Sequence, residues 1–180
     1  MNIETKRLTL FPTELKHFEL ILESKNYLSE HLGVNVSDTF PESKDALPWF
    51  YDLVKADETL VGWISFWALH RADNRLIGDI GFKGKPDENG KIEIGYSIIS
   101  EYRKQGFATE IVEAFLKFGF SKTTVKVIEA QTKTDNIGSI KILERLAMKQ
   151  IGTVEDPQDG TMFQWKLEKS EYFRGLENCA

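Results

Sequence analysis

Residues 91–120 read KIEIGYSIISEYRKQGFATEIVEAFLKFGF, and their hydrophobic period changes halfway along. Apolar residues alternate up to Ile98, which is typical of a β-strand with two unlike faces. From Gly106 onward they recur three and four positions apart, which indicates an amphipathic helix. The two elements meet at residues 103–108. A helix start offers unpaired N–H groups, and the small residues Gly106 and Ala108 leave room for a diphosphate close to the backbone.

Four motifs in order resemble those of the GNAT N-acetyltransferase superfamily. Residues 103–108, Arg-Lys-Gln-Gly-Phe-Ala, fit the acyl-coenzyme A signature Q/R-x-x-G-x-G/A. The segments EIGY at 93–96, DNIGS at 135–139 and ETKRLTL at 4–10 are similar to the branch that contains bacterial ribosomal-protein N-terminal acetyltransferases. Together the motifs cover about residues 1–150, and four motifs are far more specific than one.

The resemblance implies one α/β domain of the GNAT type. We expect it over residues 1–168, followed by a C-terminal tail at 169–180. The expected fold is a mixed, twisted sheet of about six or seven strands with about four helices. Because a strand, a helix and a further strand make a crossover, the strand at Glu93 and the one at 125–131 should be parallel neighbours. The family implies that their ends splay apart and admit acetyl-CoA.

The resemblance also implies which residues bind acetyl-CoA. Backbone N–H groups of residues 105–108 would hold the diphosphate, with positive charge from Arg103 or Lys104. A backbone N–H at Ile98 or Ile99 would polarise the thioester carbonyl. Asn136 caps the next helix or, as the resemblance implies, bonds to the pantetheine arm or a phosphate, and the two roles are compatible. The expected cofactor-binding residues are Ile98, Ile99, Arg103, Lys104, Gln105, Gly106, Phe107, Ala108, Asn136 and Ser139.

Two residues are candidates for proton transfer. An ammonium group must lose a proton before it attacks a thioester, and Glu93, opposite the apolar face of its strand, is the candidate base. The alternative is a solvent-facing Glu93 paired with Lys83 or Lys85. Ser139 is the candidate acid for the leaving thiolate, although a serine here also suits a helix cap. Tyr96, the acid in some relatives, points toward the core in this pattern.

Composition limits the other possibilities. A net charge of −5 argues against general nucleic-acid binding. The single cysteine, Cys179, gives no sign of disulfides, and His17 lacks partners at metal-ligand spacing. We find no signal-peptide pattern and no long apolar run, so we expect a cytoplasmic protein that needs neither a metal nor a membrane. Monomer and homodimer both stay open.

The remaining elements follow from periodicity and turn residues. Thr13 is the expected N-cap of a helix at residues 14–23. Trp63 and Trp67 are expected on one strand face in the core. The family often closes the helix after Asn136 with Leu-Gly-Phe, where this chain has Ala147 between Leu146 and Met148. We expect strands at 3–10, 60–70, 76–83, 125–131, 149–154 and 161–167, and helices at 14–23, 43–56, 106–120 and 137–148, with a short helix or loop at 26–40.

The function implied by the resemblance is acetyl transfer from acetyl-CoA to a primary amine within a ternary complex. The acceptor is a protein N-terminus or a small amine. The alternative is an acyl-CoA-binding regulatory module that has lost transfer. A P-loop nucleotide-binding protein is disfavoured because the chain lacks G-K-[ST].

Overall fold

The computed structural model describes residues 1–177, which form two compact units. The first unit comprises residues 1–85 and 96–114, and the second comprises 86–95 and the chain from 115 onward. Strand β5 (Lys91–Ile98) and helix α4 (Phe107–Ser121) contribute residues to both units.

The first unit contains an antiparallel run of strands in chain order. These are β1 (Ile3–Glu4), β2 (Leu8–Pro12), β3 (Phe66–His70) and β4 (Arg75–Phe82). The end of β5 continues the run, because the Ile99 N–H donates a 2.9 Å hydrogen bond to the Ile77 carbonyl. Gly78 permits this approach, since a Cβ there would meet the Ser97 carbonyl oxygen at 2.4 Å.

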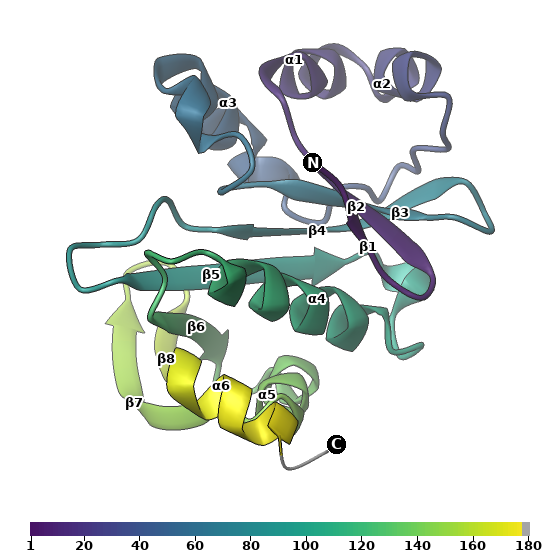
Figure 1. Ribbon diagram of the computed structural model, residues 1–180. Coiled ribbons are helices and arrows are strands. Elements are labelled where there is room, and N and C mark those ends of the chain that lie inside the picture. The colour runs from purple at the N-terminus through teal and green to yellow at the C-terminus, as the bar shows by residue number, and fades with distance from the viewer. Residues whose placement is uncertain (178–180) are drawn as a thin grey trace. The chain divides into compact units, whose positions relative to one another are not determined.

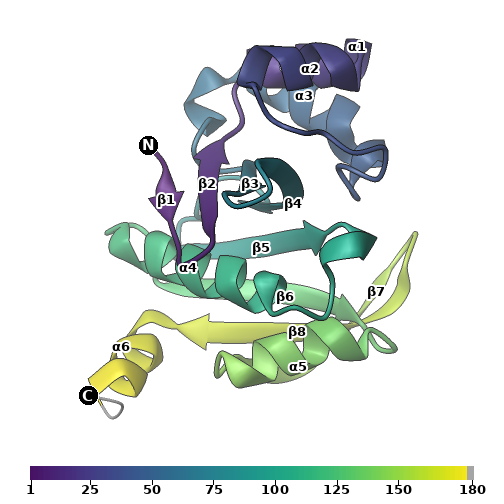
Figure 2. The ribbon, with the colours of Figure 1, turned by 90° about the vertical axis from the view of Figure 1, so that its right-hand side faces the viewer.

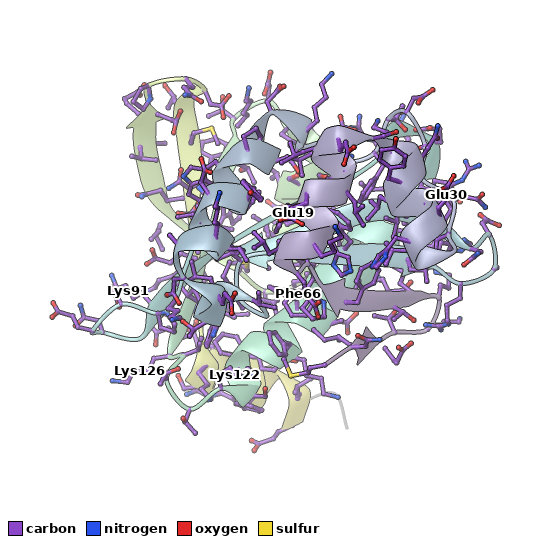
Figure 3. The ribbon with its side chains drawn as sticks, turned by 90° about the horizontal axis from the view of Figure 1, so that it is seen from above. Glu19, Glu30, Phe66, Lys91, Lys122 and Lys126 are labelled. Atoms are coloured by element: carbon purple, nitrogen blue, oxygen red, sulfur yellow. The ribbon has the colours of Figure 1, made fainter. Side chains whose placement is uncertain are left out.

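Three helices lie on one side of these strands, as Figures 1 and 2 show: α1 (Leu15–Glu23), α2 (Lys25–Leu32) and α3 (Leu47–Ala56). Trp67, only 1% exposed, packs its ring against those of Phe18 on α1 and Phe40. Viewed from above, the helices carry exposed charges such as Glu19 and Glu30 (Figure 3). The apolar stripe of α1 therefore faces the sheet.

The second unit is built on β6 (Val127–Lys133), which pairs in parallel with residues 91–94 of β5 and antiparallel with β8 (Gly160–Glu168). Strand β7 (Lys149–Asp156) completes the order on the far side of β8. Helix α5 (Ile137–Arg145) runs beside β8 in Figure 2, and α6 (Lys169–Glu177) follows β8 directly.

The predicted α/β class and the parallel pairing after the crossover are confirmed. The described residues form eight strands and six α-helices, more than the six or seven and four expected. One extra strand arises because a turn, in which the Thr5 N–H donates to the Leu8 carbonyl, divides the predicted strand at 3–10. One extra helix is α6, in the segment predicted as a tail. Cys179 lies outside the described residues.

Three local predictions are wrong. The strand predicted from residue 60 begins at Phe66, because Gly62 (φ +82°) turns the chain, so Trp63 is not a strand residue. Thr13 does not cap α1; its hydroxyl accepts a 3.0 Å hydrogen bond from Ser65, and Glu14 occupies the N-cap position. Helix α5 stops at Arg145, with Ala147 in a left-handed conformation at φ +60°.

Candidate active site

The segment between β5 and α4 presents a row of backbone donors. After the short 3₁₀ turn of Ser100–Tyr102, Lys104 (φ +58°) and Gly106 (φ +82°) both adopt left-handed backbone conformations. The first backbone bond recorded for α4 runs from the Glu110 N–H to the Gly106 carbonyl, at 3.1 Å. Helix geometry therefore leaves the N–H groups of residues 107–109 without an intrahelical acceptor. Such a run of free N–H groups suits an anion.

Gly106 is suited to this position by its backbone conformation. The nearest atom to a Cβ placed there would be Arg7 Nη2, at 3.6 Å, so space is not the constraint. The constraint is the backbone, because φ +82° is a conformation that L side chains rarely adopt. The residues present therefore fit a diphosphate held by backbone amides.

The two cations of the motif differ in their surroundings. Arg103 Nε donates to the Ile98 carbonyl at 3.0 Å, and its guanidinium also pairs with Glu42. Lys104 is exposed, and we find no ion pair for it among residues 1–177. The structure thus gives Arg103 a bracing contact, and Lys104 is the cation available to a ligand.

Arg7 braces the start of α4, a role that the motifs did not reveal. Its Nε donates to Glu110 Oε2 at 2.7 Å, its Nη1 donates to the Gln105 carbonyl at 3.0 Å, and its guanidinium lies 3.9 Å from the centre of the Phe107 ring. Glu110 also accepts from the Thr5 hydroxyl at 2.6 Å. Burial acts to raise the pKa of Glu110, but the hydrogen bonds from Thr5 and Arg7 and the charge of Arg7 outweigh it, so this pKa lies below its ordinary value.

The amides of Ile98 and Ile99 point in opposite directions. The Ile99 N–H is already engaged by the Ile77 carbonyl of β4. Because N–H groups alternate between the two edges of a strand, the Ile98 N–H points away from β4. Of the two amides expected near a thioester, only that of Ile98 points away from β4.

Glu93 lies in the second unit on the face shared with Glu129, its register partner on β6. Gln131 Nε2 donates to Glu93 Oε2 at 3.3 Å. Lys85, one of the two partners considered for Glu93, instead forms a 3.2 Å ion pair with Asp57. The splaying of β5 from β6 beyond the register of residues 91–94 stays a prediction.

Asn136 and Ser139 start α5, also in the second unit. Asn136 Oδ1 accepts from the Ser139 N–H at 3.1 Å, so the capping role considered for Asn136 is present. The Ser139 side chain is partly exposed, and its hydroxyl has no hydrogen-bond partner in the described part of the chain. That hydroxyl is therefore available to a ligand.

Asp79 on β4 is the other polar residue that sequence reasoning missed. Its carboxylate accepts from the Ser43 hydroxyl at 3.1 Å and from the Ser97 hydroxyl. Burial, and secondarily the nearby charge of Glu42, raise its pKa to about 6 against the bonds from the two hydroxyls. The sequence did contain a sign of this residue, because Asp79 is the only charged residue in the apolar segment LIGDIGF at 76–82.

Comparison with known proteins agrees with this geometry. The family model "Acetyltransferase (GNAT) domain" matches residues 7–149. The curated protein "Uncharacterized N-acetyltransferase YjdG" of Bacillus subtilis (strain 168) is 31% identical over 147 residues, which are 80% of this chain and 87% of that protein. The chain therefore belongs to the GNAT family, and it is an acetyl-CoA-dependent N-acetyltransferase.

Two solved structures show the same fold at low identity. The ribosomal L7/L12 alpha-N-protein acetyltransferase RimL, in complex with coenzyme A, superposes with a TM-score of 0.68 at 14% identity, covering 95% of this chain and 99% of that one. A spermidine N-acetyltransferase SpeG chimera from Vibrio cholerae and hSSAT gives 0.68 at 15% identity, with 93% and 99% covered.

The described residues contain no candidate metal site and no candidate membrane-spanning helix. Among residues 1–177, no three His, Cys, Asp or Glu side chains are grouped so that they could hold a metal ion. Within the same range, no helix has the length and apolar character needed to cross a membrane.

Proposed function

We propose that this enzyme binds the diphosphate of acetyl-CoA at the start of α4 and transfers the acetyl group directly to a primary amine in a ternary complex. The observation that supports this most is the row of N–H groups at residues 107–109, preceded by the left-handed Lys104 and Gly106. Backbone donors fixed by a helix bind phosphate without side-chain charge, and Lys104 adds attraction.

The proposed chemistry assigns one role to each remaining residue. Glu93 takes a proton from the acceptor ammonium, directly or through a water molecule. The amine nitrogen then attacks the thioester carbon, and the Ile98 N–H stabilises the oxyanion. The C–S bond breaks as the carbonyl re-forms, and the nitrogen releases its second proton to solvent. Ser139 donates a hydrogen bond to the departing thiolate, or a proton that it regains from solvent. Because a thiol has a pKa of about 8.5, this last assistance is modest.

The acceptor is proposed as a protein N-terminus or a small amine. RimL is named for the first kind of acceptor and SpeG for the second. The net charge of −5 is compatible with a cationic acceptor of either kind. A panel of N-terminal peptides, polyamines and simple amines, each supplied with acetyl-CoA, separates the two classes.

The alternative is an acyl-CoA-binding module that does not transfer. Such a module binds acetyl-CoA but releases no thiol with any amine. Continuous detection of free CoA thiol during the amine panel decides between the enzyme and this module.

The role of Glu93 is tested by Glu93→Gln, with Glu129→Gln as the matched control on the same face of the neighbouring strand. Loss of a general base lowers turnover by about 10²- to 10⁴-fold. We expect that loss for Glu93→Gln with unchanged acetyl-CoA affinity, and near-normal turnover for Glu129→Gln. Unchanged turnover in Glu93→Gln removes this residue from the mechanism.

A further inference from the structure

Asp79 is a carboxylate held in place within the first unit. In the β3–β4 register it lies opposite Trp67, so both side chains are on the sheet face covered by α1. Ser97 of β5 and Ser43, which precedes α3, each donate a hydroxyl hydrogen bond to a different carboxylate oxygen. The side chain therefore has a fixed orientation.

This carboxylate lacks a cation. Among residues 1–177, no Lys, Arg or His forms an ion pair with Asp79. The charged group that acts on it is Glu42, whose own partner is Arg103. A desolvated carboxylate with only neutral donors is costly, and an added ammonium group would offset that cost. The structure thus holds a negative charge ready for a cation that the described chain does not provide.

The location of Asp79 connects it to the reaction. Its donor Ser97 directly precedes Ile98, whose N–H we assign to the thioester carbonyl. A Cβ on Gly78 would lie 2.6 Å from Ile98 Cδ1, so the Ile98 side chain is on the same sheet face as Gly78. Successive strand residues face opposite sides, so this is not the face of Asp79. Asp79 and Ser97 therefore share the other face of β4 and β5 at the level of the reacting carbonyl.

We propose that Asp79 binds the ammonium group of the acceptor, with Ser43 and Ser97 holding its carboxylate, and thereby selects amines that are cationic at neutral pH. This inference rests on the proposed acetyl transfer and specifies its substrate class. A merely structural Asp79, linking β4 to β5 and to the segment before α3, is the competing explanation.

The test compares Asp79→Asn with wild type on two acceptors of similar size, phenethylamine, which is cationic at neutral pH, and 4-ethylaniline, which is neutral. Hydrogen bonds to charged groups predict a loss of about 10- to 100-fold in kcat/KM for phenethylamine. The value for 4-ethylaniline should change less than about threefold, and the Kd for acetyl-CoA should not change. Asp57→Asn, which also removes a carboxylate that accepts from a hydroxyl, is the control and should behave as wild type.

The dependence of kcat/KM on pH separates ammonium binding by Asp79 from a purely structural role, which would not produce a rise near the pKa of Asp79. Since the pKa of Asp79 is raised to about 6, kcat/KM of wild type for phenethylamine should rise as the pH increases through about 6, and this rise should be absent in Asp79→Asn. Equal losses for both acceptors, or no loss for phenethylamine, overturn the inference while leaving acetyl transfer intact. Wild type that binds acetyl-CoA but acetylates no amine refutes the proposed function and the inference with it.

Discussion

Ala147 adopts a backbone conformation that suits glycine. Its φ is +60°, its side chain is exposed, and it stands where related helices often end in Leu-Gly-Phe. An L residue in the left-handed region costs on the order of 1 kcal/mol, because Cβ crowds the backbone. The departure from the family pattern was visible in the sequence, but its conformational consequence was not.

Ala147→Gly should therefore stabilise the protein by about 0.5–1 kcal/mol, since relief of backbone strain exceeds the added entropy of the unfolded chain. The reverse substitution is available at Gly33 (φ +65°), where nothing lies within 4 Å of an added Cβ. Gly33→Ala should lose about 1 kcal/mol. Urea unfolding of both variants measures the difference, and a less stable Ala147→Gly would contradict the strain argument.

Ionised Asp79 should destabilise the folded protein, whereas a carboxylate with a lowered pKa stabilises it. Its pKa is raised to about 6 in the folded protein, so the folded state binds more protons than the unfolded state between the ordinary value of 3.8 and about 6. The stability contributed by the protonated group is present below 3.8 and is lost as the pH rises through about 6. Asp79→Asn should thus be as stable as wild type or more stable at pH 7, and a lowered Tm there would count against an unpaired charge.

At the scale of elements, the start of α4 depends on Gly106. Gly106→Ala forces an L residue to φ +82° or moves the donors of residues 107–109. We expect a loss of about 1 kcal/mol in stability and about tenfold in CoA affinity. Gly33→Ala, with a similar φ at the end of α2, is the control and should lose stability without losing CoA affinity. Calorimetric titration with CoA separates these outcomes.

The Arg7–Glu110 pair fixes the same helix start from the N-terminal segment. Because the pKa of Glu110 lies below its ordinary value of 4.5, its contribution to stability is present above 4.5 and is lost as the pH falls through the lowered pKa. Glu110→Gln should weaken CoA binding several-fold and flatten the acid dependence of unfolding. Lys16, whose 3.5 Å pair with Glu19 is exposed, offers the control Lys16→Gln, for which we expect no change. Equal CoA affinity in wild type and Glu110→Gln would mean that this pair does not position the donors.

Elements with a clear period were predictable, and contacts distant in sequence were not. Residues 91–98 alternate and residues 107–121 repeat at helical spacing, so both elements and the turn between them followed from the sequence. The helix at 169–177 was missed because its stripe is short and polar. Arg7 and Asp79 were missed because their partners, Glu110 and Ser97, lie far along the chain and no local pattern records them.

For the whole molecule, the family match spans both compact units, whereas the predicted site residues divide between them. Residues 98–108 belong to the first unit, and Glu93, Asn136 and Ser139 belong to the second. Sequence motifs predicted this set because they are linear, but they could not give the direction of each N–H group or the pairing of Arg103 with Glu42. Those features depend on how distant segments pack within a unit.

The proposed function depends on the N–H groups at the start of α4 binding a diphosphate. Calorimetric titration of wild type with CoA and with pantetheine, which lacks the diphosphate and the nucleotide, tests it directly. We predict measurable heat with CoA, binding at least about tenfold weaker with pantetheine, and loss of that difference in Gly106→Ala. Equal affinity for the two ligands, or no heat with CoA, would show that these N–H groups do not bind a diphosphate.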